Sequence, residues 1–417
     1  MFSKKVLSVG SETWKPNKLL EASIETHSWF DIKEYRENFC DQLSKKSEES
    51  KTIVIRSQRI QIFPTDDQRI RLLKWLKVSR DTYNATIKYL RTHKNKDFIR
   101  IRKQIQKKLK SMSYLLTLKK QCKIPQHTFD NAIKDVIKAY KTAFSNLKHK
   151  RIKYFRLRYK KEKAVKQTLV IESSAFYKKQ NRFTRVLGKM KSDIPFGKVE
   201  CDSRLTYNTK TKKFILWIPR NIEVNNKQEK LDICAMDPGI RTFQTCYSPD
   251  GICYKIGNNT GSRLMKEQSK IEKVSKFRHS KWYEKFTSRI YRKITNLATD
   301  LHWKTAKFLC SNFTTIYIGK LSTKGIVKNN RSKLSKNTKK LTYMLSHYSF
   351  LEKLQSKAEE FNTEVKEVSE CFTTKTCGKC GKINEKVGAK EIFECDECKY
   401  TLDRDIHGAR NIYIKNI

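Results

Sequence analysis

The sequence predicts a mixed α/β core in the second half of the chain, preceded by a β-rich region with inserted helices. Three observations lead to this prediction. Short apolar runs alternate with long helical patterns after about residue 230, and two Cys-x-x-Cys pairs lie near the C-terminus. A strand-like run at 52–63 precedes a helical pattern. The 417 residues are enough for two to four domains.

The first half contains both strand and helix signals. Residues 1–50 show no sustained hydrophobic period and are expected to form a polar extension. The run 52–63 alternates like a strand, and Pro64 and Thr65 end it and begin a helix. Residues 168–218 contain several further strand-like runs, including a hairpin.

The second half begins with LDICAMDPG (231–239), a short apolar strand that runs into an aspartate. A hairpin with a turn at 249–251 follows it. The remaining expected elements are long helices within 262–310, a strand at 314–318, an amphipathic helix at 350–361 and a strand near 364–370. The order strand, hairpin, helix, strand, helix and strand is typical of a ribonuclease H-like core.

The charge predicts a large polyanionic partner. Lysine and arginine number 91 and the acids 42, a formal net charge of +49. Such an excess over a whole chain repels itself unless it meets opposite charge, and nucleic acid fits best. A membrane is the competing partner, but no apolar run approaches the length of a transmembrane span. The N-terminus lacks an apolar signal core, so we expect an intracellular protein.

One basic run is interleaved with aromatic residues, which suits phosphate contact combined with base stacking. It occupies residues 148–166, with ten basic residues and one acid. The alternative is a solvated basic face. The candidate nucleic-acid-binding residues in this run are Lys148, Lys150, Arg151, Lys153, Tyr154, Arg156 and Arg158.

The four clustered cysteines predict a structural zinc site. Cys377 and Cys380 form one pair and Cys395 and Cys398 the second, with fourteen residues between the pairs. Two such pairs supply the four thiolates of a closed tetrahedral zinc shell, which leaves no position for a catalytic water. Chance spacing and a redox pair are the alternatives.

Two aspartates are candidate catalytic residues. Asp237 ends an apolar strand, where ligand sites of open α/β sheets lie, although Asp-Pro-Gly also forms turns. Asp405 opens a short helix after the zinc pairs, and either it or Asp403 could be an N-cap. A cap needs only one acid, and Arg404 between them is a candidate phosphate contact.

These motifs together resemble the TnpB transposon nucleases, and most closely their eukaryotic and viral branch, Fanzor. The resemblance lies in AMDPGIRTFQTCYSPDG, in the Asn296, Asp300 and His302 pattern, in TTKTCGKCG and in DRDIHGARNI. It is strong over residues 230–417. IFPTDDQ…SRDTYN (62–84) resembles the opening of the family.

The resemblance implies an RNA-guided DNA endonuclease with a RuvC-type site. Expected cofactors are two catalytic Mg²⁺ ions and one structural Zn²⁺, and expected partners are one guide RNA per protein copy and double-stranded target DNA. A eukaryotic host would imply a nuclear protein. The implied domains are an N-terminal extension (1–50), a β-barrel wedge domain (51–64 and 151–229), a helical recognition domain (65–150), a RuvC core (230–370), a zinc ribbon (371–400) and a RuvC C-terminal helix (401–417).

The middle catalytic acid of the family falls on Gly319 in this sequence. Fanzor proteins resemble this chain in losing that acid and carrying a substitute nearer the zinc ribbon. Glu364, Glu367 and Glu370 are the candidates, and Glu370 aligns with the substitute. Glu367 points to the opposite face of the expected strand and is the second choice. We therefore expect Asp237, Glu370 and Asp405 to bind the magnesium ions.

Two alternatives remain open from the sequence. A catalytically inactive nucleic-acid-binding protein would carry Gly319 as the mark of lost activity. A DNA transposase on a related fold would join transposon ends without RNA, but no end-binding helix-turn-helix is evident.

Overall fold

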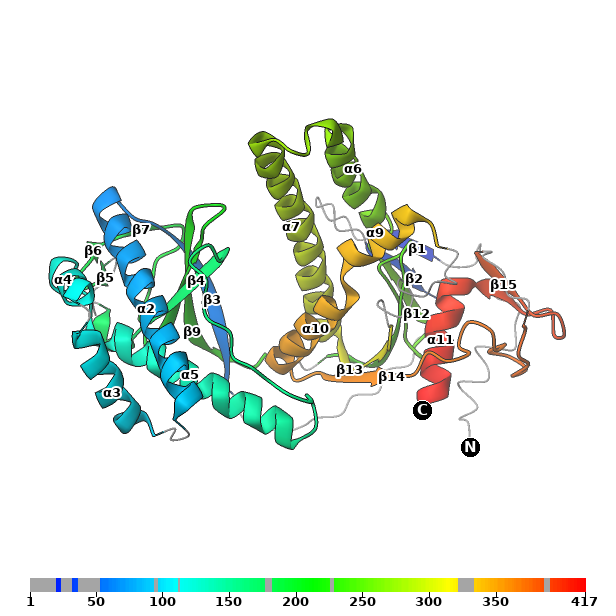
Figure 1. Cartoon of the computed structure of the whole chain (residues 1–417). Coiled ribbons are helices and arrows are strands. Elements are labelled where there is room, and N and C mark those ends of the chain that lie inside the picture. Colours follow the sequence, from blue (N-terminus) through cyan, green and yellow to red (C-terminus); the bar gives the residue numbers. More distant parts are fainter. Residues whose placement is uncertain are drawn as a thin grey trace. The chain divides into compact units, whose positions relative to one another are not determined.

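A seven-stranded mixed sheet organises the second half of the chain (Figure 1). In the computed structural model, the residues described are 20–23, 32–36, 53–93, 97–111, 113–176, 182–225, 229–321, 334–385 and 391–417. The order of the sheet is β1 (Leu20–Ser23), β2 (Ile32–Arg36), β12 (Ile252–Ile256), β11 (Gln244–Tyr247), β10 (Leu231–Pro238), β13 (Phe313–Gly319) and β14 (Glu364–Val368). β10, β13 and β14 are parallel, and the other neighbours are antiparallel. These are the order and directions that the predicted ribonuclease H-like core requires.

Helices cover both faces of this sheet. The alternation of β10 sends Cys234 and Met236 to one face and Ala235 to the other, and all three are fully buried. The first face packs against α6 (Thr260–Lys273), α7 (Lys281–Asn312), α9 (Lys336–Leu345) and α10 (His347–Phe361). The second face packs against α11 (Arg404–Asn416) and the hairpin of β15 (Ile392–Glu394) and β16 (Thr401–Asp403). A 3-10 turn, η3 (Ser275–Phe277), joins α6 to α7.

Two strands precede the region in which the sequence predicts structure. β1 pairs with β2, and β2 pairs with β12, so residues 20–36 contribute two strands to the sheet. The rest of the predicted extension lies outside the described residues. The pairing uses backbone groups of an edge strand, which need no hydrophobic period, and this explains why the sequence pattern did not reveal it.

Contacts divide the chain into two units, of which Ile55–Ile222 is one. Its helices are α2 (Asp66–Thr92), α3 (Phe98–Lys110), α4 (Ser113–Gln121) and α5 (Gln126–Lys148). The predicted start of α2 is confirmed, since Thr65 and Gln68 form a reciprocal capping box. The buried residues of α2 include Leu72, Trp75, Leu76 and Ser79.

The strands of this unit form an open sheet. Its order is β4 (Lys166–Ile171), β8 (Ser203–Asn208), β9 (Lys213–Glu223), β3 (Ile53–Phe63) and β7 (Lys191–Ser192), and beside it lie η2 (Ser173–Ala175) and the pair β5 (Arg182–Thr184) and β6 (Gly188–Lys189). Among the described residues no pairing joins β4 to β7, so the predicted barrel is not closed there. At this edge β7 pairs with β3 through only two residues, Lys191 and Ser192.

No described helix combines the length and the apolar composition that a bilayer crossing requires.

Candidate functional site

Three parallel strands bring candidate residues to one edge of the sheet. β10 ends next to Asp237, β13 ends at Gly319, and β14 ends two residues before Glu370. The register pairs Met236 with Ile318 and Gly319 with Val368, so these ends are level with one another. The carboxyl ends of parallel strands are where open α/β sheets place their ligand sites.

The side chain of Glu370 lies over Gly319. An ideal Cβ built on Gly319 would be 2.6 Å from Glu370 Cγ and 2.7 Å from its Oε1, distances that real Cβ atoms do not adopt. Glu370 Oε1 is buried and has no hydrogen-bond partner among the residues that the structure describes. A buried carboxylate oxygen without a donor is costly unless a cation binds it, so this atom fits a metal ligand. Glu367, the second candidate, is exposed and pairs with Ile318.

The helix α11 packs directly onto Asp237. A Cβ at Gly408 would lie 2.5 Å from Asp237 Oδ2, so only glycine lets the helix approach this carboxylate. The small residues at 408 and 409 predict close packing from the sequence, but the contact partner comes only from the structure. Gly408 therefore contributes to the site because its lack of a side chain leaves space for the Asp237 carboxylate.

Asp403 and Asp405 have different roles. The Asp403 side chain accepts hydrogen bonds from the backbone N–H groups of Asp405 and Ile406, both at 3.1 Å, and is the N-cap of α11. Asp403 also accepts a 2.6 Å hydrogen bond from Lys255 Nζ. The cap is thus filled by Asp403, and the Asp405 carboxylate is available for the edge that holds Asp237.

Burial raises the pKa values of all three carboxylates. Burial, and then the charges of Glu370 and Asp405, raise the pKa of Asp237 to about 8. Burial raises the pKa of Glu370, and burial together with Asp403 raises the pKa of Asp405. Arg404 opposes the shifts at Asp237 and Asp405 and so lies within their electrostatic reach. Divalent cations would neutralise such a cluster.

Asp237, Glu370 and Asp405 do not lie close enough together to form the ligand shell of a single ion. In the part of the chain that the structure describes, only the four cysteines bring three or more ligand atoms within 4.8 Å of one another.

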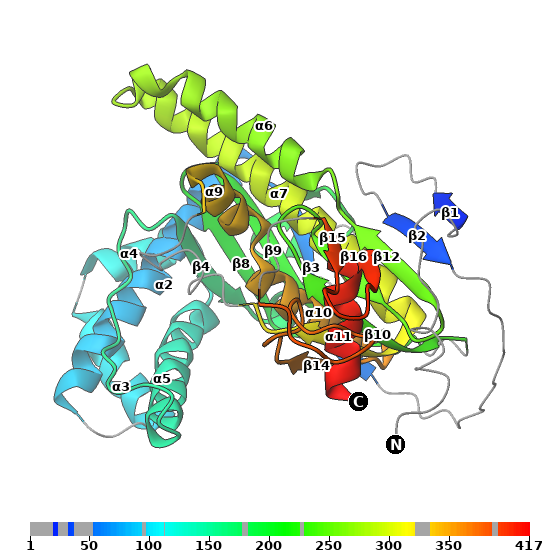
Figure 2. The ribbon, with the colours of Figure 1, turned by 90° about the vertical axis from the view of Figure 1, so that its right-hand side faces the viewer.

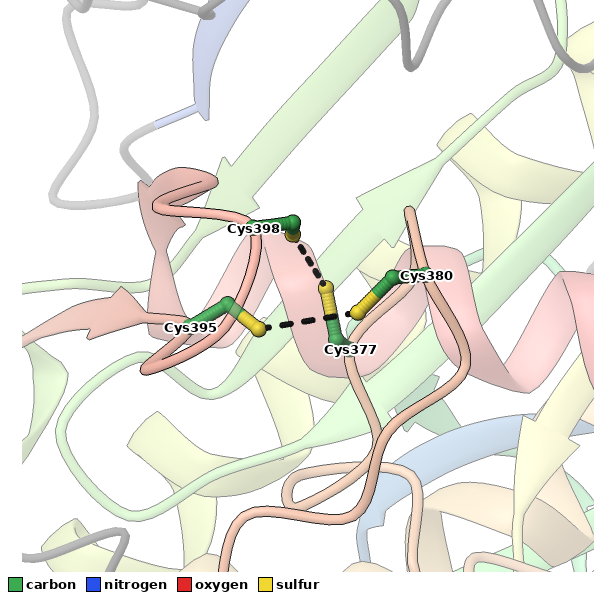
Figure 3. Close-up of side chains that lie close together, drawn as sticks. All are labelled: Cys377, Cys380, Cys395 and Cys398. Atoms are coloured by element: carbon green, nitrogen blue, oxygen red, sulfur yellow. Dashed lines mark hydrogen bonds between the residues drawn. The ribbon is translucent and has the colours of Figure 1, made fainter.

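The four predicted zinc ligands converge (Figure 3). Cys377 Sγ lies 3.5 Å from Cys398 Sγ, and Cys380 Sγ lies 3.6 Å from Cys395 Sγ. Tetrahedral Zn–S bonds of about 2.3 Å separate the sulfurs by about 3.8 Å, so the cluster fits zinc closely. Although burial raises it, hydrogen bonds from the backbone N–H groups of Cys398 and Glu397 lower the pKa of Cys395 to about 6, which favours a thiolate.

The helix α11 also holds the first cysteine pair. Asn411 Nδ2 donates to the backbone oxygens of Thr373 and Thr376, both at 2.7 Å. Arg410 Nη1 donates to Gly378 O at 3.2 Å, and Gly378 N donates to His407 Nε2 at 3.3 Å. The helix that carries Asp405 therefore fixes both the zinc knuckle and the turn that follows Glu370.

The residues of α11 that make these contacts were not predicted from the sequence. Asn411 and Arg410 are polar and almost fully buried, with exposed fractions of 6% and 3%. A buried polar side chain can be identified only from its hydrogen-bond partners. Here those partners lie more than thirty positions away in the chain. The only local signal is their position on the inner face of a short helix.

The predicted nucleic-acid-binding residues lie in the unit of Ile55–Ile222, apart from Arg404. Lys148 ends α5, and Arg151, Lys153, Arg156 and Arg158 are exposed on the segment that follows. Lys150 is exposed as well. The Tyr154 side chain is 86% exposed, as a base-stacking platform requires.

Comparisons with known proteins identify relatives over most of the chain. Residues 347–412 match the family described as Cas12f1-like, TNB domain. A TnpB-like protein of Acanthamoeba polyphaga mimivirus is 30% identical over 443 residues, covering 96% of this chain and 85% of the relative. The CRISPR-associated endodeoxyribonuclease Cas12f1 of Sulfoacidibacillus thermotolerans is 35% identical over 74 residues, 17% of each chain. The cryo-EM structure of a Cas12f1–sgRNA–target DNA complex covers 86% of this chain and 98% of its own, at 16% identity and a TM-score of 0.36.

Proposed function

Because the chain belongs to the TnpB-like protein family, we propose that it is an RNA-guided DNA endonuclease with Asp237, Glu370 and Asp405 as its catalytic carboxylates. The observation that carries this proposal is the position of Glu370. Its side chain fills the space above Gly319, where the resemblance places the family's middle acid. The lost acid therefore does not by itself favour an inactive protein, because the Glu370 carboxylate, two residues beyond β14, lies where it could serve as the replacement.

These three residues would hold two Mg²⁺ ions. Bound Mg²⁺ would neutralise charge on the phosphodiester and activate water for its hydrolysis. The chain supplies the arrangement: Asp237 from the end of β10, Glu370 beyond the end of β14 and Asp405 from the first turn of α11. Packing fixes Asp237 against Gly408 and Glu370 against Gly319, so two of the carboxylates are positioned before an ion binds.

The zinc in this proposal is structural. Cys377, Cys380, Cys395 and Cys398 would fill its shell and leave no open position for water. Hydrogen bonds join α11 to Gly378, Thr373 and Thr376, so the zinc-bound segment would hold in place the helix that carries Asp405.

The partners follow from charge. A net charge of +49 suits a protein that holds a guide RNA and a DNA duplex together. We assign the wedge to residues 51–64 and 151–229 and the helical recognition domain to 65–150, and place the exposed residues around Tyr154 and Arg156 on the RNA or the heteroduplex. Within the family we place the chain in the Fanzor branch, with one protein copy per guide RNA.

The test is to express the protein together with its flanking genomic DNA, purify it and sequence any RNA bound to it. The complex is then supplied with a DNA duplex that matches the guide segment. Mg²⁺-dependent cleavage of that duplex alone is the expected result. A purified protein with no bound RNA, or one that joins transposon ends without RNA, would overturn the proposal.

A further inference from the structure

The helical hairpin of α6 and α7 projects beyond the sheet (Figure 2). The hydrophobic core of this unit includes α7 only from Ile290 onward, whereas the helix begins at Lys281. The preceding residues, from Glu272 through Trp282, are exposed except for Val274, which is half-buried. The hairpin tip, defined here as residues 273–292, therefore extends away from the core.

The tip carries an aromatic cluster that the core does not cover. Phe277 is 47% exposed and Trp282 is 52% exposed. Their ring centroids are 5.9 Å apart and edge-on, and Trp282 stacks on Phe286 at 5.1 Å with 17° between the ring planes. Mutual packing thus orients Trp282 but leaves about half of it open. Tyr291, on the same helix, is 52% exposed as well.

The charge around this cluster is strongly positive. Within 273–292 the sequence has one acid, Glu284, and the basic residues are Lys273, Lys276, Arg278, Lys281, Lys285, Arg289 and Arg292. All seven are exposed. Lys276 Nζ lies 5.2 Å from the centroid of the Phe277 ring. An apolar protein partner would not select such a rim, whereas a polyanion with flat aromatic groups matches both features.

We propose that the hairpin tip binds unpaired nucleotides of the guide RNA, with a base stacked on Trp282 and phosphates paired with the surrounding lysines and arginines. This rests on the proposed function. The partner is single-stranded, because a base must leave its stack to offer a face to an exposed ring. RNA is favoured over the displaced DNA strand because the guide stays bound throughout the reaction. A transient strand would leave the aromatic cluster uncovered between targets.

The experiment compares Trp282→Ala with Trp303→Ala in the full-length protein with its copurified guide RNA. Trp303 is a matched control, because it is also on α7, is 39% exposed and lies near Lys357 instead of the tip. Affinity is measured for the guide RNA and for a single-stranded DNA of the same sequence. Trp282→Ala should weaken guide binding by roughly 5- to 150-fold, and Trp282→Phe should recover most of it. Trp303→Ala should bind like the wild type.

A second measurement does not depend on affinity. Ultraviolet crosslinking of the wild-type complex should join peptides of residues 273–292 to unpaired guide nucleotides, and Lys281→Gln with Lys285→Gln should lower the salt dependence of guide binding.

Wild-type guide binding by Trp282→Ala, with guided cleavage intact, would refute the inference and leave the proposed function standing. Loss of DNA binding alone would assign the tip to the displaced strand. A concentration-dependent dimer that Trp282→Ala dissociates, with guide binding unchanged, would assign it to a second copy. Either result overturns the RNA assignment, and a wild-type protein that binds no RNA overturns both proposals.

Discussion

Glu370 and Gly319 share one volume: an ideal Cβ on Gly319 would lie 2.6 Å from Glu370 Cγ and 2.9 Å from Glu370 Cδ. The two positions therefore cannot both carry a side chain without a shift of the strand or of the carboxylate. A middle acid can reach this place from β13 or from the chain after β14, but not from both. Position 319, at the end of β13, is a glycine because the Glu370 side chain needs the space that a side chain there would fill.

Glu370→Gln is expected to lower Mg²⁺-dependent cleavage by more than about 100-fold while guide and target binding stay intact, because the loss is confined to metal coordination. Gly319→Glu alone should impair the wild type by crowding Glu370. The double variant Glu370→Ala with Gly319→Glu should recover part of the rate, because alanine at 370 frees the volume that a glutamate at 319 would occupy. Single-turnover cleavage measures each rate, and Glu367→Gln is the matched control. Normal cleavage by Glu370→Gln would remove this residue from the site.

Gly408→Ala is expected to raise the Mg²⁺ concentration needed for half-maximal cleavage. The added methyl group would meet Asp237 Oδ2 at 2.5 Å and push the carboxylate or the helix away. A Mg²⁺ titration of the cleavage rate measures the change. Ala409→Gly is the control, since it costs about 1 kcal/mol of helix stability but puts no atom near Asp237. Equal Mg²⁺ dependence in both variants would contradict the close contact.

Asn411→Ala is expected to lower the free energy of unfolding by about 1–3 kcal/mol, because it leaves the carbonyl oxygens of Thr373 and Thr376 without their donor. It should also weaken zinc binding, since this turn leads into Cys377. Chemical denaturation and competition with a zinc chelator measure the two effects. Asn416→Ala, near the end of the same helix, is the control, and it should leave zinc affinity unchanged.

Cys377→Ser and Cys395→Ser are expected to release zinc and destabilise the C-terminal part, because metal binding of this kind is coupled to folding. Metal content after dialysis and resistance to proteolysis measure the change. Cys371→Ser, an exposed thiol outside the cluster, should keep full zinc occupancy. Full occupancy in the cluster variants would show that the thiolates do not hold the ion.

Acid is expected to destabilise the fold through two buried histidines. His302 and His347 both stack on the ring of Phe243, with ring centroids 5.3 and 5.1 Å from it. Burial lowers both pKa values from 6.5 to about 4, and His302 also faces Lys353 at 3.4 Å. The unfolded chain binds more protons between pH 6.5 and 4, so stability is present above pH 6.5 and is lost as the pH falls toward 4.

The expected loss over this pH window is about 3 kcal/mol for each histidine. The carboxylate cluster titrates too, so the measurement is the difference in unfolding free energy between the wild type and His302→Gln from pH 7 to 4.5. The wild type should fall more steeply. Parallel curves would show that His302 takes up a proton as readily in the folded protein as in the unfolded chain.

Local patterns predict Asp237, the four cysteines and the succession of strands and helices, because strand ends, ligand spacing and hydrophobic periods are written in neighbouring residues. Resemblance was needed for Glu370, since nothing in VKEVSE distinguishes a relocated ligand from a surface acid. Three features were not predicted: the pairing of β2 with β12, the open sheet beside α5, and the hydrogen bonds that Arg410 and Asn411 donate to the chain around the first cysteine pair. Each depends on partners far away in the chain or on backbone groups that carry no residue signature.

The pairing of β2 with β12 has a practical meaning for anyone who engineers this protein. Five residue pairs tie residues 32–36 to the sheet that bears Asp237, with two strands, β12 and β11, between them and β10. Removing residues 32–36 to shorten the protein would leave the backbone donors and acceptors on that side of β12 without partners. A shortened variant would need a new cover for that edge, or it would associate with itself through it. Any shortened form should therefore keep these residues.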